Sequence, residues 1–552
     1  MQEASGAEDT RVVSRARGFG RDQMRTAKGS RTVTFSWIRR WLCLADLANR
    51  PGAPAAEELV ERSWEAPVSR RAFLRAAGGA ALAATAGELL RPLEVLAGPQ
   101  APRVAIVGGG IAGLSAGYSL RQAGIRPQIY EASTRTGGRI FSVRDAVVPG
   151  LVTEFGGEFI DSGHGEMLRF ARLFGLRLID LKGGGEARLR PTFYFDGRRI
   201  SEAEVVRAFQ PIARRIRQDQ DAVGDVVTYR HHTPRARELD RISISEYLDR
   251  IGASGWVQEL LEVAYVGEYG LEAGEQSALN LVLLIGTDPT PTFEVYGDSD
   301  ERYSVRGGNQ QIPNRLAQLL EPSLHLGHRL VALRQRGSGY RLAFERRGAG
   351  TVEVDADFVI LTVPFTILRE LELQVDLPPV KRRAIRELGY GTNSKLILGF
   401  QERVWRKAGS SGELFTDLPW QSGWDSSRGR PGKAGTYTVF LGGRAGVEVG
   451  EGLAREQAEK VLPDLERIFP GARAAATGRV ARWHWPSDPF VRGSYACWKV
   501  GQYTSIAGAE FEPVGRLLFA GEHTSLEHQG YMNGAAETGR RAAQIVRRFV
   551  RR

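Results

Sequence analysis

A glycine-rich turn near residue 108 constrains the fold of this chain more than any other feature. Residues 103–107 form a short apolar run with β-branched side chains, which predicts a strand, and Gly108, Gly110 and Gly113 follow it in GxGxxG spacing. Residues 112–123 then place apolar side chains at helical intervals. In such a unit the glycines let the backbone approach a pyrophosphate, which sits at the helix N-terminus. We therefore expect an α/β domain with a dinucleotide site at this turn.

The residues after this helix indicate which dinucleotide is bound. Residues 128–130 predict a second strand, which ends at Glu131, an acid placed to bind a ribose diol. Gly137, Gly138 and Arg139 follow; the arginine can neutralise a pyrophosphate, and the glycines let a loop pass close to the cofactor. Together with the GxGxxG turn, these residues resemble the extended FAD-binding signature of the flavin amine oxidases.

A second signature lies near the C-terminus. Residues 515–534 predict a buried strand, a loop and a helix that begins near Met532, and they resemble the C-terminal signature of the monoamine oxidase family. The resemblance implies that Glu522 and Thr524 lie along the ribityl–phosphate region of FAD. It also implies that the helix N-terminus near Met532 faces the N1/O2 edge of the flavin, where a partial positive charge stabilises the reduced form. Val331 is expected to meet the adenine through its backbone.

One lysine lies in a segment that is otherwise apolar on both faces. Residues 394–400 predict a buried strand, and Lys395 is its second residue. A buried lysine is costly unless it has a partner or a function, although a lysine at a strand end could also extend to solvent. The resemblance implies that Lys395 holds a water at the flavin N5 and supplies positive charge for oxygen reduction.

Three aromatic residues match the family's positions near the flavin. The resemblance implies that Tyr495 and Tyr531 form the two walls of an aromatic cage through which an amine passes, and that Trp485 lies near the flavin. Core packing is the alternative for either tyrosine. The mammalian monoamine oxidases attach FAD through a cysteine directly before the first cage tyrosine. Ser494 holds that position, and Cys497 lies three residues later, so we predict noncovalent FAD.

The segment after residues 154–157 bears on the substrate. L-amino-acid oxidases of this family commonly place an arginine for the substrate carboxylate there, whereas this chain has Glu158 and Asp161 nearby and no arginine. Asp161 falls where some polyamine oxidases carry an acid that faces a distal ammonium. The alternative is that Glu158 and Asp161 cap the next helix, near Glu166.

The N-terminal region resembles an export signal. Residues 69–75 read SRRAFLR, residues 76–87 are apolar or small, and residues 95–97 form a possible cleavage site. This pattern resembles a twin-arginine (Tat) signal peptide, which is recognised by the Tat export machinery and predicts a periplasmic or extracellular protein. Residues 1–68 are an extension that we expect to be partly disordered. No later stretch reaches 18 apolar residues, so we expect no stable membrane span.

Composition excludes several classes of protein. The 552 residues carry a net charge of +11, but much of this charge lies at the two ends of the chain, which disfavours a nucleic-acid-binding face. Two cysteines exclude a disulfide scaffold, the eight histidines show no metal-binding spacing, and no GxSxG motif supports a hydrolase. We expect no metal site.

The resemblance implies a two-domain α/β fold of the FAD-dependent amine oxidases, with a Rossmann-like FAD domain and a mixed-sheet substrate domain. Both domains are expected to be discontinuous. The FAD domain is assigned residues 100–178, 300–384 and 488–552, and the substrate domain is assigned 179–299 and 385–487.

The implied reaction is oxidation of a C–N bond of a small primary or secondary amine, a monoamine or a polyamine, to an imine, with O2 as acceptor and H2O2 as product. Three alternatives stay open: an L-amino-acid oxidase, a carotenoid-type desaturase and a non-catalytic FAD-binding protein of the envelope. The desaturase would want a long apolar tunnel and no Tyr495–Tyr531 pair.

Overall fold

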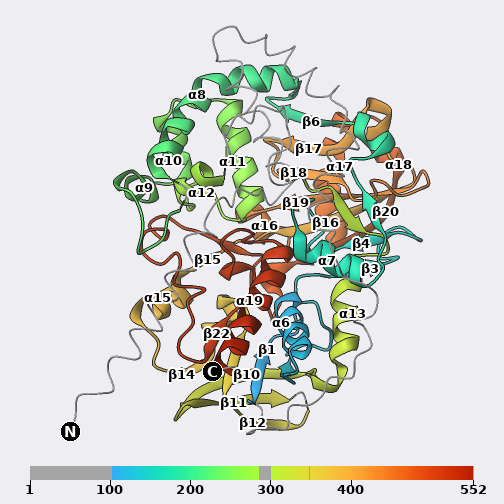
Figure 1. The fold of residues 1–552 in the computed structure, drawn as a ribbon. Helices are drawn as coiled ribbons and strands as arrows, with labels where there is room; N and C mark the ends of the chain where they lie inside the picture. Colours follow the sequence, from blue (N-terminus) through green and yellow to red (C-terminus); the bar gives the residue numbers. More distant parts are fainter. Residues whose placement is uncertain (1–101, 225, 285–299, 347, 551–552) are drawn as a thin grey trace, which may run out of the picture.

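A computed structural model describes residues 102–550 apart from 225, 285–299 and 347 (Figure 1). The predicted Tat signal, its cleavage site and the extension before it lie outside the described residues. Within the described part, no helix combines the length and the hydrophobicity that crossing a bilayer requires.

The glycine-rich turn joins a strand and a helix, as predicted, and the strand belongs to a five-stranded parallel sheet. Its strand order is β22-β13-β1-β2-β9, and every neighbouring pair is parallel. The strands are β1 (Val104–Val107), β2 (Gln128–Tyr130), β9 (Leu324–His325), β13 (Phe358–Leu361) and β22 (Leu517–Phe519).

Side chains alternate across β1 and bury both faces of this sheet. Val104 and Ile106 pack in a core with the helices α6 (Ile111–Gln122), α7 (Gly165–Leu173), α13 (Gln311–Leu320) and α19 (Met532–Val550). Ala105 and Val107 pack in a second core toward a four-stranded sheet of order β12-β11-β10-β14. That sheet consists of β10 (His328–Arg336), β11 (Gly339–Arg346), β12 (Gly350–Ala356) and β14 (Glu372–Gln374), drawn at the bottom of Figure 1. The result is a three-layer Rossmann-like domain.

A seven-stranded mixed sheet forms the other half of the molecule. Its order is β20-β16-β19-β18-β17-β6-β7; β17 and β6 are parallel, and the other pairs are antiparallel. The strands are β6 (Arg190–Phe195), β7 (Arg198–Ile200), β16 (Ser394–Phe400), β17 (Ser410–Thr416), β18 (Ser422–Asp425), β19 (Gly435–Leu441) and β20 (Ala476–His484).

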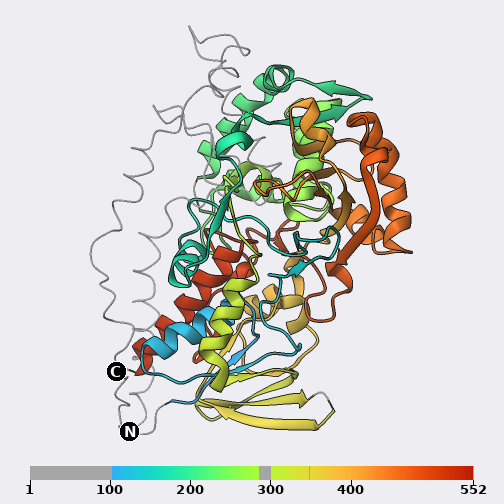
Figure 2. The same ribbon diagram turned by 90° about the vertical axis from the view of Figure 1, so that its right-hand side faces the viewer.

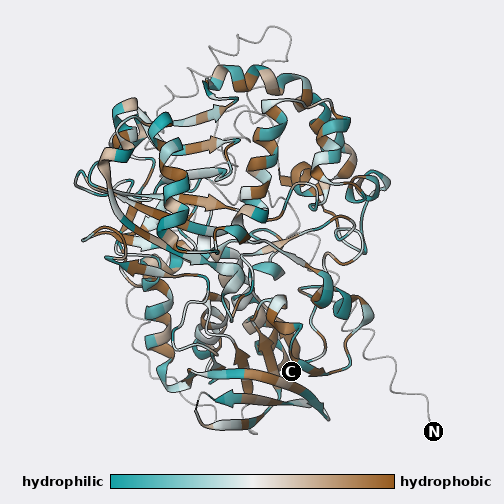
Figure 3. Cartoon of the chain, turned by 180° about the vertical axis from the view of Figure 1, so that it is seen from behind, coloured by the Kyte–Doolittle hydropathy of each residue, from teal (hydrophilic) through white to brown (hydrophobic). Residues whose placement is uncertain are grey.

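Helices cover much of both faces of this sheet (Figure 2). Strand β16 is buried along its whole length, because Leu396, Leu398 and Phe400 pack in a core with α17 while Ile397 packs against Val147, Val148 and Phe155. One group is α8 (Glu202–Val223), α9 (Pro234–Asp240), α10 (Ile244–Arg250), α11 (Trp256–Tyr269) and α12 (Ala278–Leu284); the other is α16 (Gly443–Glu448), α17 (Ala454–Ile468) and α18 (Ala472–Ala475). The outer helices alternate hydrophilic and hydrophobic residues along their length (Figure 3).

Short elements join the two halves. They are β3 (Ser142–Arg144), β4 (Val152–Glu154), β5 (Leu178–Asp180), β8 (Tyr303–Val305), α14 (Phe365–Leu368), α15 (Pro379–Glu387), β15 (Gly389–Tyr390) and β21 (Ala496–Cys497). Both large sheets take strands from widely separated segments. The expected α/β fold, with a Rossmann-like domain and a mixed-sheet domain that are both discontinuous, is confirmed.

Candidate active site

A cavity of about 1020 Å³ is lined by residues from both large sheets. We call one part the glycine-rich end; it is lined by Gly108, Gly110, Tyr130, Glu131, Ser133, Arg135, Gly137, Gly138, Arg139, Val331 and Thr362. We call the other part the aromatic end; it is lined by Gly157, Glu158, Phe159, Glu301, Lys395, Trp424, Phe440, Trp483, Trp485, Tyr495 and Tyr531.

Two glycines of the predicted motif have no space for a side chain: Gly108, which lines the glycine-rich end, and Gly113 of α6, which is not among the residues that line the cavity. Gly108 has φ +110°, and a Cβ there would lie 2.4 Å from Oγ1 of Thr362. A Cβ on Gly113 would lie 2.0 Å from the carbonyl oxygen of Gly108. Helix α6 begins at Ile111, and its N-cap, Gly110, provides no side-chain cap. The free amides of the first turn therefore favour an anion at this point.

Glu131 is held at the wall of the glycine-rich end by backbone amides. Its carboxylate accepts hydrogen bonds from Gly109 N at 2.6 Å and from Ser133 N at 2.8 Å. Val331 of β10 lies on the same wall, at the position where the adenine is expected. A glycine cradle, an uncapped helix end and a fixed acid match the donor and acceptor set that a dinucleotide needs.

Arg139 connects the N-terminal and C-terminal signatures. Its Nη1 donates to Oε1 of Glu522 at 2.8 Å and to the carbonyl of Ser494 at 2.6 Å. The Glu522 carboxylate also accepts from the amides of Ala496 and Gly530. Arg139 and Glu522 both line the cavity, and the roles predicted for them toward the cofactor stay predictions.

The C-terminal helix begins where the sequence predicts. The first residue of α19 is Met532, and this residue lines the cavity. Thr524, in contrast, is not among the residues that line the cavity. Its hydroxyl donates to the carbonyl of Gly521 at 2.9 Å, so the structure does not bring Thr524 together with the other predicted cofactor contacts.

Lys395 is buried at the aromatic end and is paired with an acid. Its Nζ donates to Oε2 of Glu158 at 2.7 Å and to the carbonyls of Glu154 at 3.1 Å and Gly156 at 3.0 Å. The side chain is 6% exposed, so the alternative in which this lysine extends to solvent is wrong. The Trp424 ring centroid lies 5.3 Å from Nζ. Three acceptors match the three ammonium hydrogens, and Lys395 presents its charge to the cavity.

The two predicted cage tyrosines line the same cavity. Tyr495 donates its hydroxyl to the carbonyl of Gly267 at 3.1 Å, which ties it to α11. Tyr531 contacts the ring of His164 edge to face, with 4.9 Å between centroids. Trp485 also lines the cavity, and its Nε1 donates to the carbonyl of Phe155 at 3.2 Å.

Comparison with known proteins decides the family, because residues 111–547 match the family described as flavin containing amine oxidoreductase. The chain belongs to this family. A flavin-containing amine oxidase from Danio rerio is 25% identical over 458 residues, 80% of this chain and 85% of that protein. An L-amino-acid oxidase from Siganus canaliculatus is 26% identical over 468 residues, with coverage of 80% and 85%. In fold the chain is similar to cyclohexylamine oxidase from Brevibacterium oxydans, with a TM-score of 0.72 and 20% identity over 82% of this chain and all of that one.

The protein is therefore a flavin-dependent amine oxidoreductase, and its cofactor is FAD. The glycine-rich end fits this cofactor: Gly108 and Gly113 leave room for a backbone-lined cradle, and the cavity continues to Met532, the first residue of α19. When bound, FAD supplies the chemistry for removing two electrons from a C–N bond.

Burial shifts the pKa of several groups around the cavity of this amine oxidoreductase. Burial raises the pKa of Glu154 to about 7, although hydrogen bonds from Ser142 and Asn309 lower it. Burial lowers the pKa of His164 well below its ordinary value. The pKa of His523 falls to about 3 for the same reason. Both histidines are therefore neutral at pH 7.

Asp161 lies outside the set of residues that line the cavity of the amine oxidoreductase. Its carboxylate accepts from Glu301 N at 2.9 Å and lies 3.4 Å from Nε2 of His164. The capping alternative is wrong, because α7 has no cap from its N-cap residue and Glu166 N donates to Asn533 Oδ1 instead. The acids that do line the aromatic end are Glu158 and Glu301, and sequence reasoning missed the roles of both.

Ser494 and Cys497 occupy different surroundings. The Ser494 hydroxyl donates to Oδ1 of Asn393 at 2.6 Å, and Ser494 lines the cavity. Cys497 is fully buried, and its Sγ lies 3.8 Å from Nδ2 of Asn280. Cys497 is not among the residues that line the cavity.

Proposed function

We propose that this protein is an amine oxidase that converts a primary or secondary amine to an imine and reduces O2 to H2O2. The observation that carries this proposal is Lys395, which is buried and paired with Glu158, in one cavity with Tyr495 and Tyr531. The family supports the oxidation of an amine. A fixed positive charge beside the flavin site favours reduction of O2, because negative charge develops on oxygen in that step.

The chain's own residues act on the substrate in three ways. The tyrosine rings orient the amine, whose nitrogen meets their π faces. The aromatic walls exclude water, which strengthens the electrostatic effect of the Lys395 charge on the negative charge that develops on oxygen. The amine arrives neutral and gives up a hydride equivalent, two electrons and one proton, from the α-carbon; the resulting iminium then loses a proton from nitrogen to give the imine. Water hydrolyses the resulting imine to an aldehyde and ammonia or a smaller amine, and O2 takes up two electrons and two protons.

An L-amino-acid substrate is the second candidate, because a relative is an L-amino-acid oxidase. Its carboxylate needs a cation in the cavity. The described residues that line the cavity include four arginines, and each already has an acid or a carbonyl as partner. These arginines are Arg135, Arg139, Arg329 and Arg492. Glu158 and Glu301 at the aromatic end would repel the carboxylate of an amino-acid substrate, so we favour amines that carry no carboxylate.

Anaerobic mixing of the yellow protein with monoamines, polyamines and L-amino acids tests this proposal. We expect amines to bleach the flavin absorbance, and air to restore it with one H2O2 per cycle. Bleaching by L-amino acids alone would replace the substrate class. Reoxidation by a quinone or a cytochrome, but not by air, would replace the acceptor.

We also propose that FAD is bound noncovalently, because a serine cannot form the thioether for which a cysteine is needed at position 494. Acid precipitation should leave the yellow flavin in the supernatant. Flavin that stays in the protein pellet would contradict this proposal.

For export, we propose the twin-arginine route on the basis of residues 69–97. A fusion of residues 1–97 to a reporter should reach the periplasm, and the pair Arg70→Lys and Arg71→Lys should keep it in the cytoplasm. On the same ground we propose that the protein lies outside the cytoplasm. Export of the paired variant at the wild-type level would contradict the twin-arginine route.

A further inference from the structure

Glu301 is a buried acid that lines the aromatic end, and among the described residues neither of its carboxylate oxygens has a hydrogen-bond partner. The residue is 3% exposed. An acid in this position is costly, since a buried polar group normally finds a partner. The two carboxylate oxygens are therefore free to accept hydrogen bonds from donor groups of a bound ligand.

The backbone of Glu301 is also strained. Its φ of +42° lies in the left-handed region, which a residue other than glycine rarely adopts. Its amide donates to Oδ1 of Asp161 at 2.9 Å, and this hydrogen bond holds the turn. Strain of this kind persists where the surrounding structure fixes it, and it concentrates at functional sites. In this arrangement Asp161 holds the backbone of Glu301.

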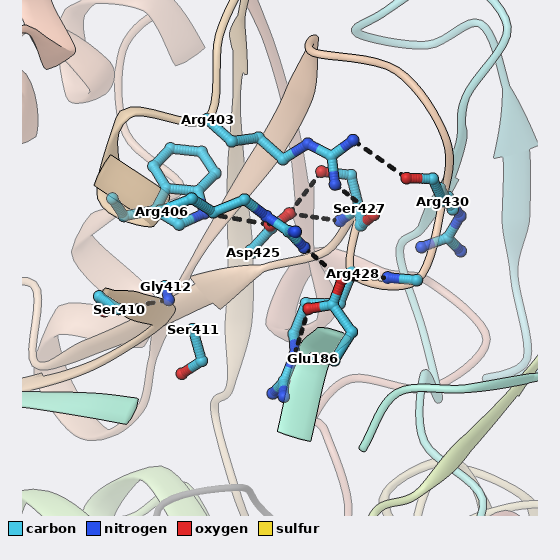
Figure 4. Close-up of polar contacts among 12 residues, drawn as sticks. Glu186, Arg403, Arg406, Ser410, Ser411, Gly412, Asp425, Ser427, Arg428 and Arg430 are labelled. Atoms are coloured by element: carbon cyan, nitrogen blue, oxygen red, sulfur yellow. Dashed lines mark hydrogen bonds and ion pairs between the residues drawn. The ribbon is translucent and has the colours of Figure 1, made fainter. Parts of the chain in front are cut away.

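Two arginines near Glu301, Arg406 and Arg428, are bound to other acids, whereas Lys182 lines the same small cavity as Glu301 and acts on it through its charge. This cavity of about 10 Å³ adjoins the aromatic end and shares Glu158, Phe159, Glu301 and Trp424 with it. Among its arginines, Arg428 pairs with Glu413 and lies 3.6 Å from Glu186, as the network in Figure 4 shows in part. Beside this cavity, Arg406 bonds Glu186 at 2.6 Å and lies 3.5 Å from Asp425. Neither guanidinium hydrogen-bonds to Glu301.

The charges that face Glu301 come from several elements. Burial, and then the negative charge of Asp161, raise the pKa of Glu301 well above its ordinary value, and Glu268 and Glu413 act in the same direction. The positive charge of Lys182 acts in the opposite direction. A further cation at the carboxylate would favour its ionised form.

We propose that Glu301 binds the second ammonium group of a diamine or polyamine whose other nitrogen is oxidised beside Tyr495 and Tyr531. The inference rests on the proposed function and narrows its substrate class. The ammonium supplies the donors that the carboxylate lacks, and the apolar chain between the nitrogens lies along aromatic side chains. Phe159 and Trp424, with ring centroids 5.6 Å apart, provide such a surface next to Glu301. A substrate with a distal carboxylate is repelled at the same place.

The test compares α,ω-diamines with n-alkylamines of equal carbon number on the FAD-loaded wild-type protein. We expect kcat/KM to favour the diamine by about 100-fold at the best chain length, since a desolvated charge pair contributes strongly to binding. The Glu301→Gln variant keeps the size and removes the charge, and it should reduce this ratio to about one. Glu301→Asp should restore part of the ratio.

Glu275→Gln provides a matched control, because Glu275 is an exposed acid paired with Lys499 on the surface. This variant should keep the diamine preference. If wild type oxidises both classes of amine equally, or if Glu301→Gln keeps the wild-type ratio, the inference is wrong and the proposed function stands. If no amine reduces the bound flavin, the proposed function itself fails. The wild-type comparison decides the inference even where a variant does not fold.

Discussion

At the glycine-rich end of the cavity the wall is largely backbone, whereas at the aromatic end it consists of side chains. Gly108 on the wall and Gly113, which packs against the Gly108 carbonyl from α6, leave no room for a Cβ, and the acid Glu131 is fixed by two amides. At the other end Lys395 depends on Glu158, an acid 237 positions away in the sequence. The shape of a wall made of backbone depends on the conformation of the main chain, so it changes only when that conformation changes. A wall of side chains can be altered one group at a time.

This difference predicts two kinds of variant. Changes at the glycine-rich end should remove the cofactor and with it every activity. Changes at the aromatic end should keep the yellow cofactor and alter only rates, specificity or stability.

The largest effect is expected for Gly113→Val. A Cβ at this position would lie 2.0 Å from the carbonyl of Gly108, and neither backbone can move without disturbing β1 or α6. Overpacking of this kind costs about 1–3 kcal/mol or more, so FAD loading should fall at least about tenfold. The ratio of absorbance at the flavin band to that at the protein band measures the loading.

Gly165→Ala is the control for this substitution. Gly165 is the first residue of α7, and a Cβ there would have no atom within 4 Å. This variant should load FAD as wild type does. Full loading of Gly113→Val would show that the cradle tolerates a side chain, and the contrast between the two ends would not hold.

The next effect concerns Lys395→Met, which should retain FAD. Loss of the charge should slow flavin reoxidation by about 100-fold in stopped flow. The substitution also leaves Glu158 buried without its partner, so the free energy of unfolding should fall by about 3 kcal/mol in denaturant titration.

A double variant separates these two consequences. Lys395→Met with Glu158→Gln removes both charges, so it should recover most of the lost stability while reoxidation stays slow. Reoxidation at the wild-type rate in either variant would remove the role of Lys395 in oxygen reduction. Equal instability of the single and the double variant would show that the ion pair is not the cause.

The contrast between the ends also explains what the sequence could predict. The turn at 108–113, the strand at 394–400 and the start of α19 at Met532 follow from local spacing, and the structure has them where they are predicted. Backbone cradles are local in sequence, because a strand, a turn and a helix N-terminus are consecutive.

Side-chain walls are not local, and this is where sequence reasoning was incomplete. A buried lysine signals that an acid must lie near it, but nothing in the spacing identifies Glu158 as that acid. The family pattern points to Asp161 as a substrate contact. In the structure the Asp161 carboxylate accepts a hydrogen bond from the backbone amide of Glu301 instead of lining the cavity. Glu301 carries no motif, and only its left-handed backbone and its place on the cavity wall single it out.

A smaller effect is expected at Tyr495. Replacement by leucine removes the ring, and kcat/KM for the best amine should fall by about tenfold, in line with the strength of contacts between amines and aromatic faces. Replacement by phenylalanine keeps the ring and loses the hydrogen bond to Gly267, so it should cost about 1 kcal/mol of stability and less activity than the leucine variant. Equal losses in the two variants would show that the hydroxyl, and not the ring, matters.

The smallest effect is expected at His528, which is linked through His164 to the aromatic end. Its ring lies 5.3 Å from that of His164, which in turn contacts Tyr531. Burial lowers the pKa of His528, but the hydrogen bond and the charge of Glu537, with the charges of Glu527 and Asp161, raise it overall.

A histidine whose pKa is raised in the folded state stabilises the fold below its unfolded pKa, and this contribution disappears as the pH rises through the folded pKa. Wild type should therefore lose about 1 kcal/mol of stability between about pH 6 and pH 8 that His528→Gln does not lose. His231→Gln, at an exposed position, should reproduce the wild-type pH profile. Equal pH profiles for wild type and His528→Gln would show that the pair with Glu537 forms without a proton on the imidazole, and the link between this loop and the aromatic end would then be packing alone.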